Sequence, residues 1–385
     1  MKLPQLLGHY VSPRILLGPY ASPASQPALQ ALRDDADYQE LRRRLTRAGV
    51  FERAPLAYAA RFVGWFAVYV ALFGYLLSAP SWPARLAACV LLGLAHTHCN
   101  FLGHDISHGA AVPGRLGANL AGQIFNTLLT GFSFSYFRRS HTLHHYHCNE
   151  QGHDPDTMSV MWSVSPYEAA GKRGLGRLTT RLQHVVIPVM YTFWAFALKS
   201  EGIKYCLRNP RAACADLAVL VAHVALWFGL SVHYLSLGAA LLNYAVMTAV
   251  VGVYLGLIFP VNHVGMAIVS SDEATARGFL AHQLMTTRNV TGSRLRDFAF
   301  MGLNAQIEHH LFPWIPSMRL GAARPIVRAF CAERGLPYHE SSHRGAHVDV
   351  LRHLRGIARS GAANQVDAGS VHSTDDAKAH SVASA

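Results

Sequence analysis

Long apolar runs alternate with polar, histidine-rich stretches along this chain. Four of the runs approach the roughly 20 residues that a helix needs to cross the hydrocarbon core of a bilayer. The links within the first pair and within the second pair are short and contain turn formers, so we expect each pair to form a helical hairpin. The pattern predicts an all-α integral membrane protein with four transmembrane helices. The runs cover residues 62–79, 84–103, 212–233 and 236–259.

Two weaker apolar stretches do not fit a full span. Residues 118–137 carry Asn119, Gln123 and Asn126 among their apolar positions, which favours an interfacial or re-entrant segment. Residues 184–198 are apolar and aromatic but short. We expect an interfacial helix there, lying along the membrane surface rather than crossing the bilayer.

Composition narrows the class of protein further. Of the 385 residues, 51% are hydrophobic and only 15% are charged, a balance typical of membrane proteins. The net charge of +12 fits anionic lipid headgroups or a phosphate-bearing substrate. A nucleic-acid binder would carry its basic patch on a polar domain, so we expect no nucleic-acid partner. The six cysteines form no CxxC pair and are expected to be buried thiols in a reducing compartment.

Three histidine clusters stand beside the apolar runs: HDISH at 104–108, HTLHH at 141–145 and QIEHH at 306–310. Residues at i, i+3 and i+4 of a helix share a face, so we expect the side chains of each cluster to point one way. Seven imidazoles exceed the three or four ligands of one zinc ion, which predicts two metal ions in one site. Imidazole suits iron, copper and zinc alike, and the spacing does not name the metal. The cluster residues are His104, His108, His141, His144, His145, Gln306, His309 and His310.

Histidines outside the clusters are assigned by their position. His263 directly follows the fourth apolar run, on the side of the clusters, and we expect it to be an eighth ligand. His96 and His98 lie inside the second run, where a buried, hydrogen-bonded role is the simpler interpretation. His147 and His153 follow the second cluster, and we leave them outside the site.

Metal-bound imidazoles usually donate their other ring N–H to a carboxylate or carbonyl group. Several carboxylates lie inside or just beside the clusters, and each either holds a ligand in this way or is structural. Gln306 occupies the position of a third histidine in its cluster, and we expect its amide to hydrogen-bond a metal-bound water. The candidate carboxylates are Asp105, Asp154, Asp156, Asp297 and Glu308.

The number of spans places the clusters on one side of the membrane, because two spans precede the first two clusters and two more precede the third. The opposite loops carry only Arg85, so the positive-inside rule predicts a cytoplasmic, histidine-rich cap and cytoplasmic termini. We see no cleavable signal. We expect a cytoplasmic N-terminal segment over 1–60, a membrane domain over 61–340, and a C-terminal segment over 341–385 that is disordered from about residue 360.

The HxxxH, HxxHH and QxxHH motifs, set between paired apolar runs, resemble the histidine boxes of the membrane fatty acid desaturases. The resemblance covers about residues 55–340. It is strongest in SHTLHHYHCNEQGHDPD, in LMTTRNV, and in GLNAQIEHHLFPWIPSMRL followed by CAERGLPYHE. The Gln-led third box is similar to that of the front-end (Δ5/Δ6-type) desaturases and related bacterial acyl desaturases.

The resemblance implies a non-haem centre of two iron ions that activates O2 and desaturates a long-chain fatty acyl substrate in lipid metabolism. Many front-end desaturases carry a fused cytochrome b5 domain with an HPGG motif, which we do not find here. We therefore expect an external electron donor, either ferredoxin or a cytochrome-type protein with its reductase. Ala305 stands where many relatives have an aromatic residue, which affects the expected substrate channel. The implied iron ligands are His104, His108, His141, His144, His145, His263, His309 and His310.

Alternatives remain at this point. A hydroxylase or an acetylenase would use the same histidine scaffold, and only the product separates them from a desaturase. A zinc-dependent membrane hydrolase would need one metal ion and three or four ligands, and a non-catalytic transporter would leave the histidine spacing unexplained. The sequence leaves open the double-bond position, the substrate-binding residues and the acyl carrier, which is coenzyme A, acyl carrier protein or an intact lipid.

Overall fold

The computed structural model describes residues 36–159 and 162–360 and is mostly helical. The described residues contain one small sheet, in which β1 (Asn289–Val290) pairs in parallel with β2 (Glu340–Ser341). The predicted all-α class is therefore confirmed. Most of the N-terminal segment and the tail predicted to be disordered fall outside the described residues, and the predicted domain boundaries stay predictions.

Four helices are long and apolar enough to cross a membrane, as predicted. The helix that carries the first histidine cluster extends to residue 107, because the polar HDIS stretch continues the apolar helix instead of ending it. Ser81 and Ser236 cap the second and fourth of these helices: their hydroxyls accept hydrogen bonds from Ala84 N and Ala239 N. The four helices are α5 (Pro55–Ser78), α6 (Trp82–Ser107), α11 (Cys214–Tyr234) and α12 (Leu237–Ile258), the last continued by α13 (Pro260–His263).

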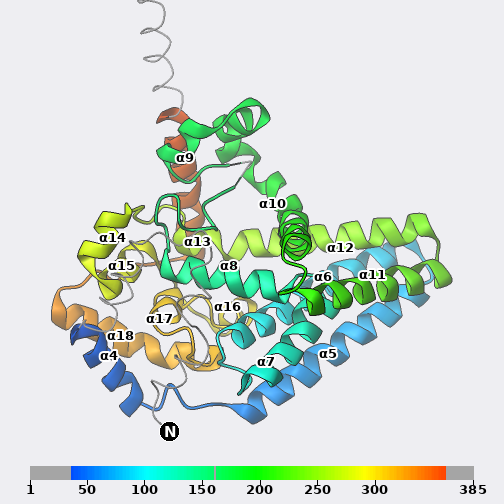
Figure 1. The fold of residues 1–385 in the computed structure, drawn as a ribbon, viewed down its shortest axis with the longest axis horizontal. Helices are drawn as coiled ribbons and strands as arrows, with labels where there is room; N and C mark the ends of the chain where they lie inside the picture. Colours follow the sequence, from blue (N-terminus) through cyan, green and yellow to red (C-terminus); the bar gives the residue numbers. More distant parts are fainter. Residues whose placement is uncertain (1–35, 160–161, 361–385) are drawn as a thin grey trace, which may run out of the picture.

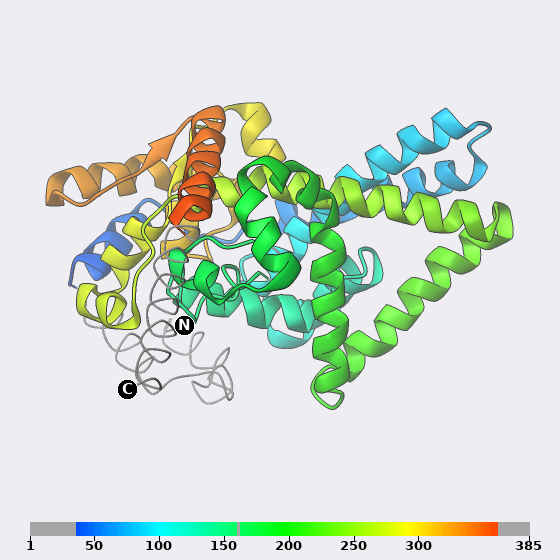
Figure 2. The same cartoon turned by 90° about the horizontal axis from the view of Figure 1, so that it is seen from above.

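The two short links between these helices lie at one end of the molecule, on the right in Figures 1 and 2. The second and third histidine clusters belong to the other end, where α8 (Phe134–Tyr146) and α17 (Gln306–Leu311) meet the end of α6. The shorter elements gather around that end. They are α4 (Ala36–Arg47), α9 (Pro166–Gly171), α14 (Ser271–Arg277), α15 (Phe279–Thr286), α16 (Arg294–Ala299), η2 (Ser317–Arg319), α18 (Leu320–Arg334) and a last helix over 343–360.

The stretch 184–198 is part of a much longer helix, α10 (Gly174–Arg208), so the predicted short helix was wrong in length. Its polar flanks hid the ends, although every third or fourth residue on one face is buried. Figures 1 and 2 show α10 lying across α12 rather than along it. Its opposite face is an exposed apolar stripe, as an interfacial helix would have. The stripe consists of Leu175, Leu178, Leu182, Val185, Val189 and Phe193.

Two glycines of α12 make the crossing with α10 possible. A Cβ atom on Gly252 would overlap the carbonyl oxygen of Tyr191, and one on Gly256 would overlap the Tyr191 ring. Small residues four apart let two helix backbones approach closely, the arrangement found between many membrane helices. This close approach holds Tyr191 near the end of α12, where His263 follows.

The stretch 118–137 does not form a span. It contains α7 (Arg115–Gly122), a π-helix η1 (Gln123–Leu128) and a turn into α8. The carbonyl groups of residues 128–130 end the π-helix in the interior, and each meets a polar side chain from another helix. Tyr69 and Lys199 donate to two of them over 2.5 Å, and Nδ1 of His223 lies 2.8 Å from the third. Buried carbonyl groups need such partners, which anchor the turn.

Asp216 of α11 sets where α8 begins. Its buried carboxylate accepts hydrogen bonds from Ser133 Oγ at 2.6 Å and from the backbone N–H of Ser135 at 2.9 Å. Ser133 in turn caps α8 by accepting from Tyr136 N. The second histidine cluster is therefore positioned by a carboxylate on a different apolar helix.

At the other end, α4 supports the third cluster. Tyr38 donates a hydrogen bond to the carbonyl oxygen of Leu311 at 3.0 Å and stacks on Phe312, with ring centroids 4.9 Å apart. Both partners directly follow His309 and His310. The main apolar core continues from here into α6 and α18, so the histidine-bearing segments are part of one packed unit.

Candidate metal centre

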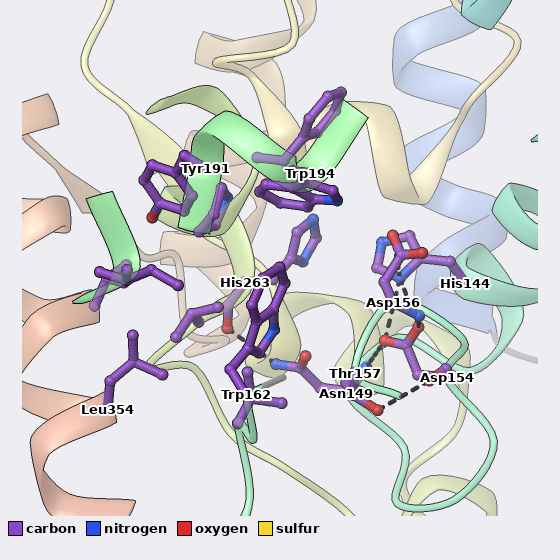
Figure 3. Close-up of a pocket in the computed structure, with 16 residues that line it drawn as sticks. His144, Asn149, Asp154, Asp156, Thr157, Trp162, Tyr191, Trp194, His263 and Leu354 are labelled. Atoms are coloured by element: carbon purple, nitrogen blue, oxygen red, sulfur yellow. Dashed lines mark hydrogen bonds and ion pairs between the residues drawn. The ribbon is translucent and has the colours of Figure 1, made fainter. Parts of the chain in front are cut away.

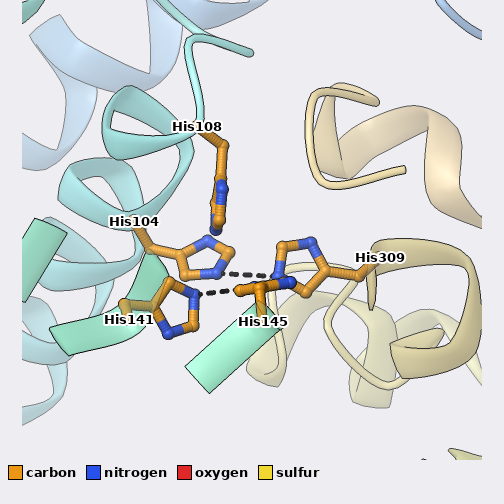
Figure 4. Close-up of side chains that lie close together, drawn as sticks. All are labelled: His104, His108, His141, His145 and His309. Atoms are coloured by element: carbon orange, nitrogen blue, oxygen red, sulfur yellow. Dashed lines mark hydrogen bonds between the residues drawn. The ribbon is translucent and has the colours of Figure 1, made fainter. Parts of the chain in front are cut away.

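Five histidines from three helices converge in a first group (Figure 4). One ring nitrogen of each lies within 4.8 Å of one ring nitrogen of every other. The closest pairs are His104 with His309 and His141 with His145, whose Nε2 atoms are 3.1 Å apart in both cases. The first group consists of His104 and His108 from the end of α6, His141 and His145 from α8, and His309 from α17.

A second group adjoins the first and contains His144, His263 and His310, with the thiol of Cys148 beside them. The ring centroid of His263 lies 4.8 Å from that of His144 and 4.8 Å from that of His310. The two groups touch where the rings of His145 and His310 stack with centroids 4.2 Å apart. The structure thus brings all eight predicted ligands together, in two adjacent sets.

Adjacent histidines divide between the two groups. In HTLHH, His145 turns to the first group and His144 to the second, and in QIEHH the same division separates His309 from His310. The predicted common face of each cluster therefore holds only in part, because neighbouring residues on a helix point about 100° apart. A helix placed between the two groups can serve both through one HH pair.

Four of the imidazoles are suited to bind metal because burial keeps them neutral. Burial lowers the pKa of His141, His145, His309 and His310 well below the usual value, and the neighbouring histidines lower it further. His310 Nδ1 lies 2.9 Å from Gln283 Oε1, so its Nε2 carries the lone pair, and that buried atom has no hydrogen-bond partner. Unpartnered buried nitrogens are costly unless something binds them, so this arrangement fits a metal ion.

Three of the predicted carboxylates lie against rings of the predicted ligands, and the exposed Asp156 is the most distant, with Oδ2 3.6 Å from His144 Nδ1. Asp105 Oδ1 is 3.2 Å from His104 Nδ1, and the hydroxyl of Tyr58 donates to the other oxygen at 2.7 Å. Asp154 Oδ1 is 3.0 Å from His144 Nδ1. Burial alone would lower the pKa of His144, but the carboxylates of Asp154 and Asp156 raise it to about 9.

Gln306, Glu308 and Asp297 make other contacts. Gln306 Nε2 lies 3.1 Å from His263 Nε2, so this amide faces the second group. Glu308 is fully buried but touches no histidine; it accepts hydrogen bonds from Asn289 and Tyr338. Asp297 accepts a hydrogen bond from Asn304 Nδ2 at 2.7 Å instead of facing a ligand.

The histidines outside the predicted set stay outside both groups. His147 Nδ1 is 2.8 Å from Glu150, and His153 lies on the other side of the same carboxylate. His98 stacks on Trp65 with centroids 4.1 Å apart. His96 is buried without a hydrogen-bond partner, contrary to the hydrogen-bonded role predicted for it.

Three polar residues near the ligands escaped the sequence analysis. Gln283 bridges two clusters, since its Oε1 faces His310 Nδ1 and its Nε2 donates to the carbonyl oxygen of His145 at 2.9 Å. Asn149, with φ at +54°, donates to the carbonyl oxygen of His263 at 3.0 Å. Cys148 Sγ lies 3.4 Å from His263 Nδ1. The sequence contains a positional signal: Cys148 and Asn149 lie inside SHTLHHYHCNEQGHDPD, and Gln283 directly precedes LMTTRNV.

The cysteine prediction holds for five of the six thiols, which are free and buried. Cys214, the first residue of α11, is exposed, so the prediction of a buried thiol was wrong for this residue. No other described thiol belongs to either histidine group, so the cysteines contribute only Cys148 to the surroundings of the site.

A pocket opens against the second group (Figure 3). One wall is polar and contains His144, Asn149, Asp154 and Asp156, while the rest is largely apolar and aromatic. Counted together with its open mouth, the empty space of this pocket is about 640 Å³. The apolar lining includes Trp162, Val164, Ile187, Tyr191, Trp194, Phe259, Val350 and Leu354.

Comparisons with known proteins agree with this geometry. The family model described as fatty acid desaturase matches residues 80–342, more than half of the chain. An acyl-lipid (9-3)-desaturase of Physcomitrium patens is 26% identical over 341 residues, which cover 85% of this chain but only 63% of that protein.

For two further relatives, the match to this chain covers a larger share of the relative. A Delta(8)-fatty-acid desaturase of Euglena gracilis is 28% identical over 360 residues, or 89% of this chain and 84% of the relative. The Delta(5) fatty acid desaturase fat-4 of Caenorhabditis elegans is 26% identical over 312 residues, covering 78% and 69%. With three histidine boxes folded into two adjacent groups, and a family match over more than half of its length, this chain belongs to the fatty acid desaturase family.

Proposed function

We propose that this chain is an O2-dependent fatty acyl desaturase with a centre of two iron ions. The observation that carries the proposal is the pair of adjacent groups of buried histidines. The first group would hold one ion through five imidazoles and the second would hold the other through three. In this assignment the ligands are His104, His108, His141, His145 and His309 for one ion and His144, His263 and His310 for the other.

When bound, the two iron ions would supply the O2 activation that an unactivated methylene requires, because such a carbon offers no acidic or basic group to the protein. The chain itself orients the ligands. Asp105 and Asp154 accept hydrogen bonds at the Nδ1 atoms of His104 and His144, which leaves the Nε2 lone pairs for metal. Gln306 lies beside His263 in the second group, where its amide would hydrogen-bond a metal-bound water.

We propose the pocket beside the second group as the site of the acyl chain. It is largely apolar and has His144 and His263 in its lining, so a methylene pair inside it would lie next to the second metal ion. The apolar walls exclude water from the reacting carbons, which favours reaction with the acyl chain over side reactions.

The topology is also part of the proposal. Two short links at one end of the molecule support two membrane hairpins with the histidines on the opposite side. The scarcity of Lys and Arg in the links supports a cytoplasmic position for that histidine-rich cap and for both termini. Electrons would come from an external donor there, either ferredoxin or a cytochrome-type protein with its reductase.

Mass spectrometry of fatty acids from a heterologous host tests the activity. The host would make the wild type, the His144→Ala/His145→Ala double variant, or His233→Ala as a control at an exposed histidine of α11. We expect a new unsaturated acyl species from the wild type and from the control only. A hydroxylated or triple-bonded product would indicate the hydroxylase or acetylenase, and one zinc ion in place of iron would indicate the hydrolase.

A further inference from the structure

One wall of the pocket beside the second group comes from residues outside the family match. The family match ends at residue 342, and the helix over 343–360 begins directly after it. Val350 and Leu354 of this helix line the pocket. Figure 3 shows Leu354 on the side of the pocket away from His144, so this helix lines the end that is far from that histidine.

Val350 and Leu354 are almost fully buried, with 1% and 2% of their surface exposed. They pack with Val164, Ile187 and Tyr191 in a small apolar cluster that is separate from the main core. Ala346 of the same helix joins the main core, whereas Val350 and Leu354 cover Ile187 and Tyr191 of α10.

Arg288 links the helix over 343–360 to the second histidine group through hydrogen bonds. Its guanidinium donates to the carbonyl oxygens of Val261 and Val264, on either side of His263, and to that of Ala346 in the last helix. It also lies 3.3 Å from the carboxylate of Asp349. The position of the helix is therefore tied directly to the segment that carries a ligand.

The far end of the helix is fastened to the opposite wall. Gln183 of α10 is fully buried, and its Nε2 donates to the carbonyl oxygens of Ser163 and Leu354 at 3.0 Å each. His353 Nε2 lies 2.6 Å from the carbonyl oxygen of Val164. Fixed at both ends, the helix presents Val350 and Leu354 to the pocket as rigid surfaces.

We infer that Val350 and Leu354 are specificity-determining residues that set how much acyl chain fits beyond the second metal position; the inference rests on the proposed function. A rigid apolar wall rejects each extra methylene that it cannot accommodate, and one methylene changes selectivity by roughly 10-fold or more. Shortening these side chains lengthens the pocket, and enlarging them shortens it.

The test compares two pairs of substitutions on one helix. Leu354→Ala and Val350→Ala alter the pocket, while Leu351→Ala and Val348→Ala make the same chemical changes at positions that are 39% and 37% exposed. Each holoenzyme would be made in a host fed an equal mixture of acyl chains that differ by two methylenes, and the ratio of desaturated products measured by mass spectrometry.

We expect the pocket variants to raise the ratio of longer to shorter products by about 10-fold, Val350→Phe to lower it, and both controls to keep the wild-type ratio. An unchanged ratio in active pocket variants, or an equal shift in the controls, would overturn the inference. If the Leu354→Ala protein does not accumulate, the milder Leu354→Val variant replaces it, and the same change in product ratio is expected. Absence of any desaturated product from iron-loaded wild type would instead reject the proposed function.

Discussion

His144 Nδ1 lies 3.0 Å from Asp154 Oδ1, and the loop that follows α8 folds back around the same carboxylate. The backbone N–H groups of Asn149 and Asp156 donate to it at 2.7 and 2.9 Å. A fully buried carboxylate with three such partners has one orientation. It therefore fixes the ring of His144 and directs Nε2 toward the second group.

Replacing Asp154 by Asn should weaken metal binding in the second group, because an amide oxygen is a poorer acceptor and the buried N–H donors lose a charged partner. Changes to such partners typically cost about 10–100-fold in metal affinity or activity. Asp156→Asn is the matched control, since that side chain is 57% exposed and lies 3.6 Å from the same ring. Iron content after dialysis against a chelator measures the effect, and equal losses in both variants would contradict the role given to Asp154.

A second prediction concerns the crossing of α10 and α12. Alanine at Gly252 would overlap the Tyr191 carbonyl oxygen and approach Ala195 N to 3.1 Å, so the two helices must separate. Overpacking of this kind costs about 1–3 kcal/mol, and displacement of Tyr191 would also lower activity. Thermal unfolding in detergent gives the stability change. Gly229→Ala in α11 has nothing within 4 Å and should be neutral or slightly stabilising.

A third prediction concerns Glu308, whose buried carboxylate is hydrogen-bonded to Asn289 of the small sheet. Burial raises its pKa, and the hydrogen bonds from Asn289 and Tyr338, each 2.8 Å long, act against that rise. Tyr338→Phe removes one donor and leaves a buried carboxylate less satisfied, at a cost of about 1–3 kcal/mol. The expected result is a lower melting temperature. Tyr167→Phe, at a side chain that is 65% exposed, should leave it unchanged.

Much of the architecture was open to prediction because it depends on local pattern. Span lengths follow from apolar runs, and the spacing in HDISH and HTLHH brings pairs such as His104 and His108 onto one helix face. His263 was identified by its place after a span. These features need no knowledge of how distant segments meet.

What escaped prediction depends on contacts between distant segments. Gln283 was missed because its two partners, His145 and His310, lie 138 and 27 residues away. The division of HTLHH between two groups depends on where His263 and His310 arrive, and the full length of α10 depends on its packing against α12. Polar ends hide a helix from an apolar-run criterion even when tertiary packing extends it.

The division into two groups leads to a last prediction, on metal content. His108 belongs only to the first group and His310 only to the second. His310→Ala leaves two histidines in its group, too few to hold an ion, whereas His108→Ala leaves four of five in the other. We therefore expect His310→Ala to lose about half of the wild-type iron and His108→Ala to lose less, with His233→Ala as the unaffected control. Both ligand variants should lose desaturation, His310→Ala because one ion is missing and His108→Ala because the ion in the first group has lost one ligand. Iron per chain, measured by elemental analysis beside product formation, checks this; complete loss of iron from His310→Ala would mean that the two groups bind metal as one unit.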